Sequence, residues 1–141
     1  MLTQTQTTSF KVELMQAVHD FTSSTGDVFK LALYAGDATL NASTTVYTTA
    51  GEVTGTNYTA GGIALTNITP TSSGTTAFTS FDTATFTDVT LTARGALVYN
   101  STKGNKSVCV LDFGSDITKT AADFIVTFPT ASATDAVLRI S

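Results

Sequence analysis

The feature that most constrains the fold of this chain is a pair of β-rich runs on either side of a short polar segment. The first run is Thr90–Tyr99, the second is Ser107–Gly114, and Asn100–Lys106 lies between them with a glycine in it. This pattern predicts a long β-hairpin. An Arg-Gly pair interrupts the first run, as is common at a β-bulge or bend. The longest patterned segment therefore predicts architecture and presents no recognisable reactive centre.

Composition extends this prediction to the whole chain. The 141 residues suffice for one self-supporting domain. Only 13% are charged, while threonine, which favours extended backbone, makes up roughly one residue in five. A neutral, threonine-rich sheet has little charge repulsion and has edges that must be paired or covered, so we expect an oligomer or part of a larger assembly. The net charge of -4 argues against a nucleic-acid partner.

The chain divides into a short arm and one domain. Residues 1–8 are polar and without periodicity, which predicts a flexible N-terminal arm, and residues 9–141 are expected to form a single β-sandwich domain. The first residues lack the pattern of a secretory signal, and no run is long enough to cross a membrane. We therefore expect a protein that is made and folded in a cytoplasm and does not bind a membrane.

One helix and seven or eight strands are expected. Apolar spacing predicts a helix over Phe10–Phe21, with Ser9 as its N-cap. The period then changes to two, which predicts a half-buried strand over Phe29–Tyr34, and a polar loop is expected after Gly114. Further expected strands are Ile63–Leu65, Ala77–Phe81, Phe124–Phe128 and Ala136–Ile140. The predicted fold is mainly β, an antiparallel sandwich of jelly-roll-like form with one N-terminal α-helix.

The search for reactive groups favours structural roles. His19 is the only histidine and has no second ligand or catalytic partner in the sequence pattern. Cys109, the only cysteine, lies in an apolar strand and is expected to be a buried hydrophobe. Asp112-Phe113-Gly114 matches the kinase magnesium triplet, but the rest of that constellation is missing.

Carboxylates offer two weaker alternatives. Asp112, Asp116 and Asp123 could supply oxygen ligands to Ca²⁺, although their spacing fits no standard loop. Asp82 and Asp88 could act as a glycosidase pair, but the chain has no tryptophan for a sugar platform. We therefore predict that the protein is not an enzyme and has no cofactor or metal.

Three cations are the candidate protein-interaction residues. Arg94 interrupts a neutral strand, where it serves either as an exposed charge paired with a nearby Asp or as a contact to a neighbouring subunit. Lys103 and Lys106 lie at the predicted hairpin tip. We expect these two residues, together with Arg94, to be points of contact in an assembly.

Several segments together resemble small virion structural proteins of tailed bacteriophages. They are Phe10–Phe21, Asp27–Tyr34, Gly55–Gly62 and the hairpin Thr90–Gly114, and the resemblance covers most of the chain. It implies a capsid decoration or cement protein, a small β-rich body on the virion surface that bridges major capsid subunits and contacts other copies of itself. It supplies no position-specific binding residue. The alternatives are a tail, neck or fibre-associated virion protein and a carbohydrate-binding module.

Overall fold

A computed structural model describes residues 1–141 and shows a mainly β protein with 46% of its residues in strands and 6% in a helix. The elements in chain order are β1 (Thr5–Gln6), α1 (Thr8–Met15), β2 (Phe29–Tyr34), β3 (Ile63–Ala64), β4 (Thr71–Ser73), β5 (Thr76–Thr79), β6 (Ala84–Asn100), β7 (Lys106–Val126) and β8 (Leu138–Ile140). No helix is long and apolar enough to cross a membrane.

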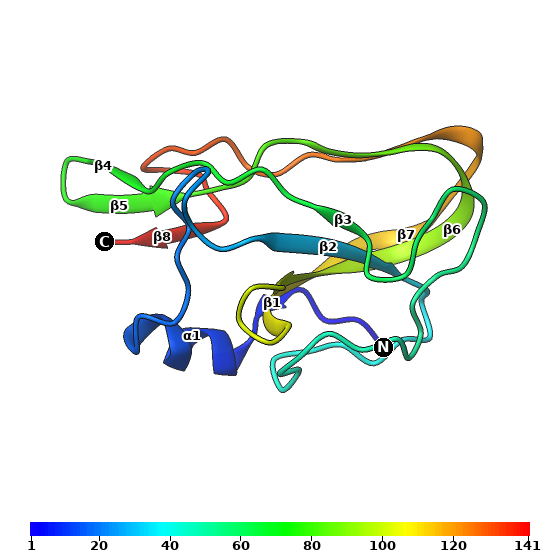
Figure 1. The fold of residues 1–141 in the computed structure, drawn as a ribbon, viewed down its shortest axis with the longest axis horizontal. Coiled ribbons are helices and arrows are strands. Elements are labelled where there is room, and N and C mark those ends of the chain that lie inside the picture. Colours follow the sequence, from blue (N-terminus) through cyan, green and yellow to red (C-terminus); the bar gives the residue numbers. More distant parts are fainter.

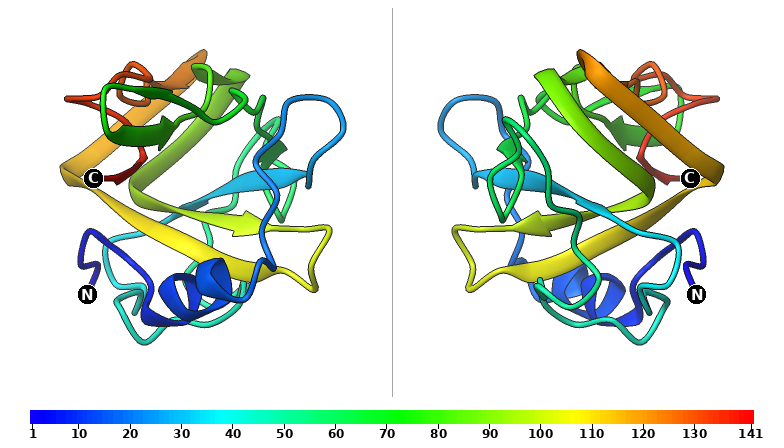
Figure 2. Two further views of the ribbon diagram at one scale, coloured as in Figure 1. Left: turned by 90° about the vertical axis from the view of Figure 1, so that its left-hand side faces the viewer. Right: turned by 90° about the vertical axis from the view of Figure 1, so that its right-hand side faces the viewer.

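The strands form two antiparallel sheets, an arrangement consistent with a β-sandwich (Figure 1). The larger sheet has the order β1-β7-β6-β2-β3, and the smaller has the order β4-β5-β8. The predicted hairpin is confirmed as β6 and β7, joined by the tip Ser101–Asn105. These two strands run from the tip near β1 to the right-hand end of the molecule in Figure 1, where they bend and return toward the small sheet; the bend is also visible in Figure 2. The hairpin is therefore the frame on which the other elements are placed.

Bulges let β6 keep one face on the core along its whole length. The core residues Ala84 and Phe86 are followed by Val89, Leu91 and Ala93, and then by Ala96 and Val98. The parity of the buried positions changes twice, first at the register shift between Phe86 and Val89 and second at the shift between Ala93 and Gly95, which are two of the four shifts in this strand pair. The predicted irregularity at Arg94-Gly95 is confirmed as the second of these two.

Gly95 is required at the second shift by close packing. A Cβ at this position would lie 2.3 Å from the carbonyl oxygen of Leu111 and 2.7 Å from a methyl group of Leu2. On the facing strand, Phe113–Asp116 separate the paired residues Asp112 and Ile117. The extra length of β7 is therefore accommodated opposite Arg94.

The large sheet is covered on both faces. A cluster of 20 buried residues, rich in phenylalanine, packs against one face, and a cluster of 8 packs against the other. Alternate residues of β2 divide between them: Phe29, Leu31 and Leu33 face the first cluster, while Ala32 and Tyr34 face the second. The half-buried strand predicted at Phe29–Tyr34 is present at those bounds, but it is central and covered on both sides.

The helix is shorter than predicted. It spans Thr8–Met15 and its N-cap is Thr7, whose hydroxyl accepts a hydrogen bond from the backbone N–H of Phe10. Ala17 has a positive φ of 58°, which ends the helix before the expected Phe21. The apolar spacing of Phe10 and Phe21 does bury both rings in the main core, but the second reaches the core from an irregular segment.

The residues expected to form a flexible arm are packed against the sheet. Leu2 is buried in the second core cluster, and Thr7 is fully buried. The backbone of β1 pairs with β7 at Cys109 and Val110, so the segment fills a sheet edge. Single apolar and polar contacts spaced along an extended segment produce no periodic sequence signal, so the sequence pattern did not indicate this packing.

The polar loop expected after Gly114 is also wrong, because β7 continues to Val126. Ile117 and Phe124 keep the inward face of the strand in contact with the main core. Gly114, with φ of 84°, belongs to the irregular stretch opposite Arg94. The charged and small residues around it hide a strand whose outer face is exposed.

Candidate functional site

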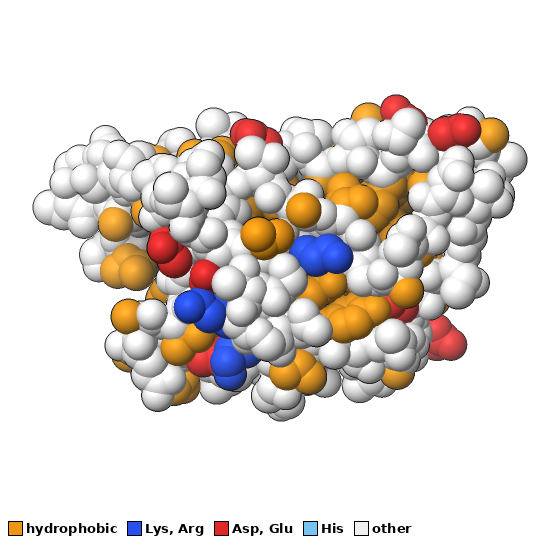
Figure 3. Space-filling view, viewed as in Figure 1, with side chains coloured by type: hydrophobic (Ala, Val, Ile, Leu, Met, Phe, Trp, Pro, Cys, Tyr) orange, Lys and Arg blue, Asp and Glu red, His pale blue; other side chains and the backbone are white.

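The structure places the candidate cations in two separate environments. Lys103 and Lys106 lie at and beside the hairpin tip, and each forms an ion pair with an acid of the same chain. Lys103 Nζ lies 3.9 Å from Asp27 Oδ1, and Lys106 Nζ lies 3.0 Å from Glu13 Oε2. Arg94 lies elsewhere, in a hollow beside the N-terminal segment. Charged side chains gather over α1 and the neighbouring surface in Figure 3, while most of that face is neutral.

Asn100 is the centre of the polar network beneath the tip. Its side chain is fully buried at the end of β6. The Oδ1 atom accepts hydrogen bonds from the backbone N–H groups of Thr102 and Lys103 at 3.1 and 3.2 Å. The Nδ2 atom donates to Asp27 Oδ2 at 2.8 Å and to His19 Nδ1 at 3.0 Å. The first two bonds fix the backbone of the tip, and the other two anchor the amide to Asp27 and His19.

These contacts assign the tautomer of His19. Because the two turn N–H groups fix Oδ1 of Asn100, the amide must present Nδ2 to the imidazole, whose Nδ1 atom is then an acceptor. The proton lies on Nε2, 3.3 Å from Glu13 Oε1. His19 therefore links α1 to the hairpin, and both of its ring nitrogens are occupied by the fold.

The network joins three segments that sequence reasoning treated separately. Glu13 belongs to α1, Asp27 precedes β2, and Asn100 ends β6. Asp27 Oδ2 also accepts the backbone N–H of Asp20 at 2.9 Å. Buried polar groups whose partners are all present specify one arrangement. No single residue of this set had a sequence signal beyond its position at the end of a helix or strand.

Arg94 lies in a hollow beside the N-terminal segment, with Asp112 and Asp116 around it. Its guanidinium is 3.9 Å from an oxygen of each carboxylate and donates to the Gly114 carbonyl at 3.0 Å. Two of the three carboxylates considered as calcium ligands are thus gathered around a cation. The third, Asp123, accepts the backbone N–H of Asp88. No group of three or more His, Cys, Asp or Glu side chains is placed to hold a metal ion.

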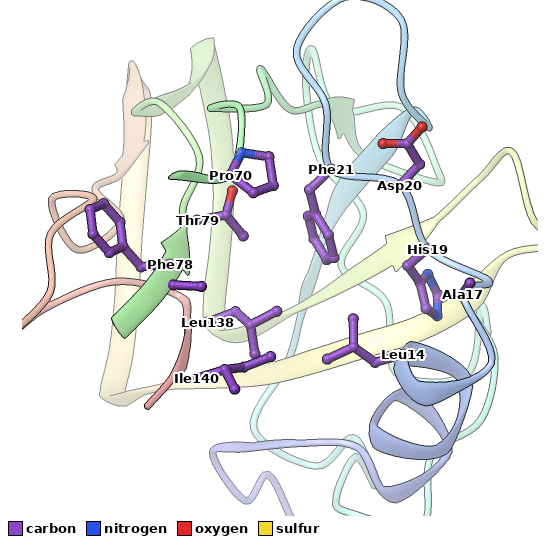
Figure 4. Close-up of a pocket in the computed structure, with 11 residues that line it drawn as sticks. Leu14, Ala17, His19, Asp20, Phe21, Pro70, Phe78, Thr79, Leu138 and Ile140 are labelled. Carbon is purple, nitrogen blue, oxygen red and sulfur yellow. The ribbon is translucent and has the colours of Figure 1, made fainter. Parts of the chain in front are cut away.

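An apolar groove of about 460 Å³ lies beside the tip network, between α1 and the small sheet. Leu14 of α1 faces Leu138 and Ile140 of β8 across the groove, with Phe21 above them (Figure 4). His19 forms part of its wall. The groove is lined mainly by hydrophobic side chains, and its polar lining residues are His19, Asp20 and Thr79.

Sequence reasoning missed a second polar cluster, built around Glu52 in the long loop between β2 and β3. Its two carboxylate oxygens accept hydrogen bonds from the hydroxyls of Tyr58 and Tyr47 at 2.7 and 2.5 Å, and from the Gly61 N–H at 2.7 Å. Tyr99 donates to the Gly61 carbonyl at 2.6 Å. Burial, followed by the charge of Glu52, raises the pKa of Tyr99 above its ordinary value. Tyr47 and Tyr99 pack with the second core cluster, whereas Tyr58 packs against the first, so the network fastens the loop to both faces of the sheet.

Cys109 is buried as expected and is the only cysteine. Burial raises the pKa of its thiol to about 12. The side chain is 6% exposed within the main core. At neutral pH the group is therefore a protonated, enclosed thiol rather than a nucleophile.

The outer edge of β7 is an open backbone edge from Ile117 onward, interrupted by a bulge at Thr120–Ala121, where Ala121 has φ of 47°. β1 pairs with β7 only at Cys109 and Val110, and from Ile117 onward β6 is its single strand partner. Along Ile117–Asp123 the side chains are exposed or partly exposed. An edge of this kind presents unpaired N–H and C=O groups to a neighbouring chain.

Comparisons with protein-family models, curated proteins and solved structures found no match.

Proposed function

We propose that the protein is a non-enzymatic virion structural protein of a tailed bacteriophage that decorates the capsid and bridges major capsid subunits. The observation that carries the proposal is the open edge of β7 along Ile117–Asp123, on a rigid hairpin. A free edge can accept a strand from a neighbouring subunit through main-chain hydrogen bonds. The resemblance of the sequence to small virion proteins supports the identity of that neighbour.

The placement of the reactive side chains supports a structural task. Both nitrogens of His19 are used within the fold, and Cys109 is enclosed in the core. The tip cations and Arg94 are half-exposed and lie beside acids of the same chain. Exposed ion pairs such as those of Arg94 contribute about 0 to 1 kcal/mol each, so this guanidinium can exchange partners when a subunit binds.

A decoration protein strengthens a shell by contacts that must all break before capsomers separate. Many copies, each with weak contacts to two subunits, act together and raise the effective affinity. The neutral surface and the open edge suit such lateral contacts. The protein partners are the major capsid protein and other copies of this chain, and the site of action is the capsid surface.

Particles made without this protein and then supplied with purified protein test the proposal. We expect deficient particles to release DNA at a lower temperature, and added protein to restore the wild-type temperature. A reconstruction of the restored particle should place the density on the shell in hundreds of copies. Density confined to the tail, neck or fibres would contradict capsid decoration and favour the alternative virion role.

A matched pair of variants tests the edge. Thr120 is exposed on β7, and a lysine on an edge strand is a natural obstacle to strand pairing. Thr120→Lys should reduce the number of bound copies, while Thr120→Ser should not. Both should unfold at the wild-type midpoint, because exposed substitutions change stability by about 0.5 kcal/mol or less. Equal binding of the two variants would rule out this edge as the contact.

A further inference from the structure

Strand β8 is held by few interactions at the edge of the small sheet. It pairs with β5 through Ala77↔Ile140, Phe78↔Arg139 and Thr79↔Leu138. Leu138 is partly buried, whereas Ile140 is 56% exposed. The guanidinium of Arg139 donates to Ala133 within the same terminal segment. The strand and its flanks are held by these three ladder positions, by Leu138 and Val137 against the main core, and by side-chain hydrogen bonds from Gln6 to the Val137 carbonyl and between Thr76 and Ser141.

Both sides of this segment are loosely packed. The groove of about 460 Å³ contacts Leu138 and Ile140, and a second groove of about 450 Å³ contacts the preceding residues Ala136 and Val137. A side chain next to open space lacks the dispersion contacts that a filled core supplies. The segment thus lies between two apolar grooves that its side chains do not fill.

The chain before β8 can act as a hinge. Phe128 is 8% exposed and anchors the chain after β7, and the Pro129 carbonyl accepts a hydrogen bond from Ser80. The next eight residues, Thr130–Val137, are small or polar up to the final valine. A turn closed by hydrogen bonds between Ser132 and Asp135, and the bond from Gln6 to the Val137 carbonyl, must open before this segment extends. When extended, it spans up to roughly 26 Å at about 3.3 Å per residue. That length carries β8 beyond its own sheet to an adjacent molecule.

We propose that β8 is an exchangeable strand, and that in assemblies of this protein β8 of one copy pairs with β5 of a second copy. The structure shows which strand binds at the edge of β5, since β8 already pairs there in a defined register. Exchange preserves these contacts, so it requires only opening of the hinge and a high local concentration of copies. The proposal rests on the proposed function only for the crowding that brings copies together.

Disulfide trapping between two single-cysteine variants tests the exchange. One protein carries Ala77→Cys and a differently tagged protein carries Ile140→Cys, both at exposed positions that face each other in the ladder. After mixing and mild oxidation, we expect a mixed disulfide species of twice the chain mass, whose yield rises with protein concentration. Cys109 lines the groove beside Ala136 and Val137 and would be uncovered when this segment opens, so all of these proteins also carry Cys109→Ala.

Two controls decide the result. Ser72 lies on β4, on the opposite side of Ala77 from Ile140, so Ser72→Cys mixed with Ile140→Cys reports random collision. A chain with both Ala77→Cys and Ile140→Cys reports whether the register permits a bond. Closure of that double variant only within monomers, or equal dimer yields from the two mixtures, would overturn strand exchange. Because these assays use the protein alone, their failure leaves binding to particles to be judged separately.

Discussion

Replacing Asn100 with alanine should destabilise the protein by about 3 kcal/mol. The substitution removes a bond to the Asp27 carboxylate, worth about 1.5 to 3 kcal/mol, and one to neutral His19, worth about 0.5 to 1.5 kcal/mol. The two turn N–H groups also lose their acceptor, but water can reach the exposed tip and offset part of that loss. The value of about 3 kcal/mol is therefore the sum of the contributions of the bonds to Asp27 and His19 alone.

Equilibrium unfolding in urea, followed by far-ultraviolet circular dichroism, measures the change. With a slope of about 2 kcal/mol per molar, the midpoint should fall by about 1.5 M while the slope is unchanged. Ser101→Ala is the matched control, because the Ser101 hydroxyl makes a single exposed hydrogen bond to Val28 and its loss should cost about 1 kcal/mol or less. Similar midpoints for the Asn100 and Ser101 variants would refute the central role of the network.

Three further outcomes follow from local geometry. Gly62→Ala should prevent stable folding, because Gly62 has φ of 74° and a Cβ there would lie 1.7 Å from a backbone oxygen of β2. The control is Gly104→Ala, at a position with φ of 67° and open space around it. In the same urea assay it should lower the free energy of unfolding by about 1 kcal/mol. Cys109 should resist a thiol reagent at pH 8 until urea unfolds the protein. The pKa of its thiol is about 12 in the folded protein, against an ordinary value of 9. Because only the unfolded chain then loses this proton readily, the thiol should lower stability as the pH rises above 9. Rapid labelling of the folded protein would contradict this. Lys103→Ala with Lys106→Ala should reduce particle binding more than it lowers the urea midpoint, because both lysines are half-exposed and the enclosed carboxylates of Asp27 and Glu13 keep their hydrogen bonds to Asn100 and His19. Loss of folding and of binding in equal measure would contradict an interaction role.

The sequence predicted those parts of the fold whose signal is local. Alternation and turn residues were sufficient for the hairpin and for Phe29–Tyr34, and an Arg-Gly pair was sufficient for the bulge. The helix end was missed because a residue in the left-handed region, Ala17, has no distinctive sequence signal when it is not glycine or asparagine. The extension of β7 past Gly114 was missed because the outer face of that strand is polar.

The polar network was not predictable for a different reason. Asn100 and Asp27 are 73 residues apart in the sequence, and His19 and Asn100 are 81 apart. Each residue type is common at the end of a strand or helix, and only the register of β2 against β6 brings them together. The sequence indicated where the tip lysines lie, but their acidic partners depend on tertiary packing. The same holds for Glu52 and the tyrosines that surround it.

The tip network and the open edge matter together because they lie at different positions on one hairpin. A protein that bridges two neighbours must hold two contact surfaces at a fixed separation, or the entropy of ordering them opposes binding. The bulged β6–β7 pair supplies that rigidity, and Asn100 fixes the tip before any partner arrives. Opening of the network would therefore weaken a contact at the tip even where the rest of the fold persists. In the proposed role, the buried amide would favour assembly by reducing the conformational freedom that a partner must otherwise remove.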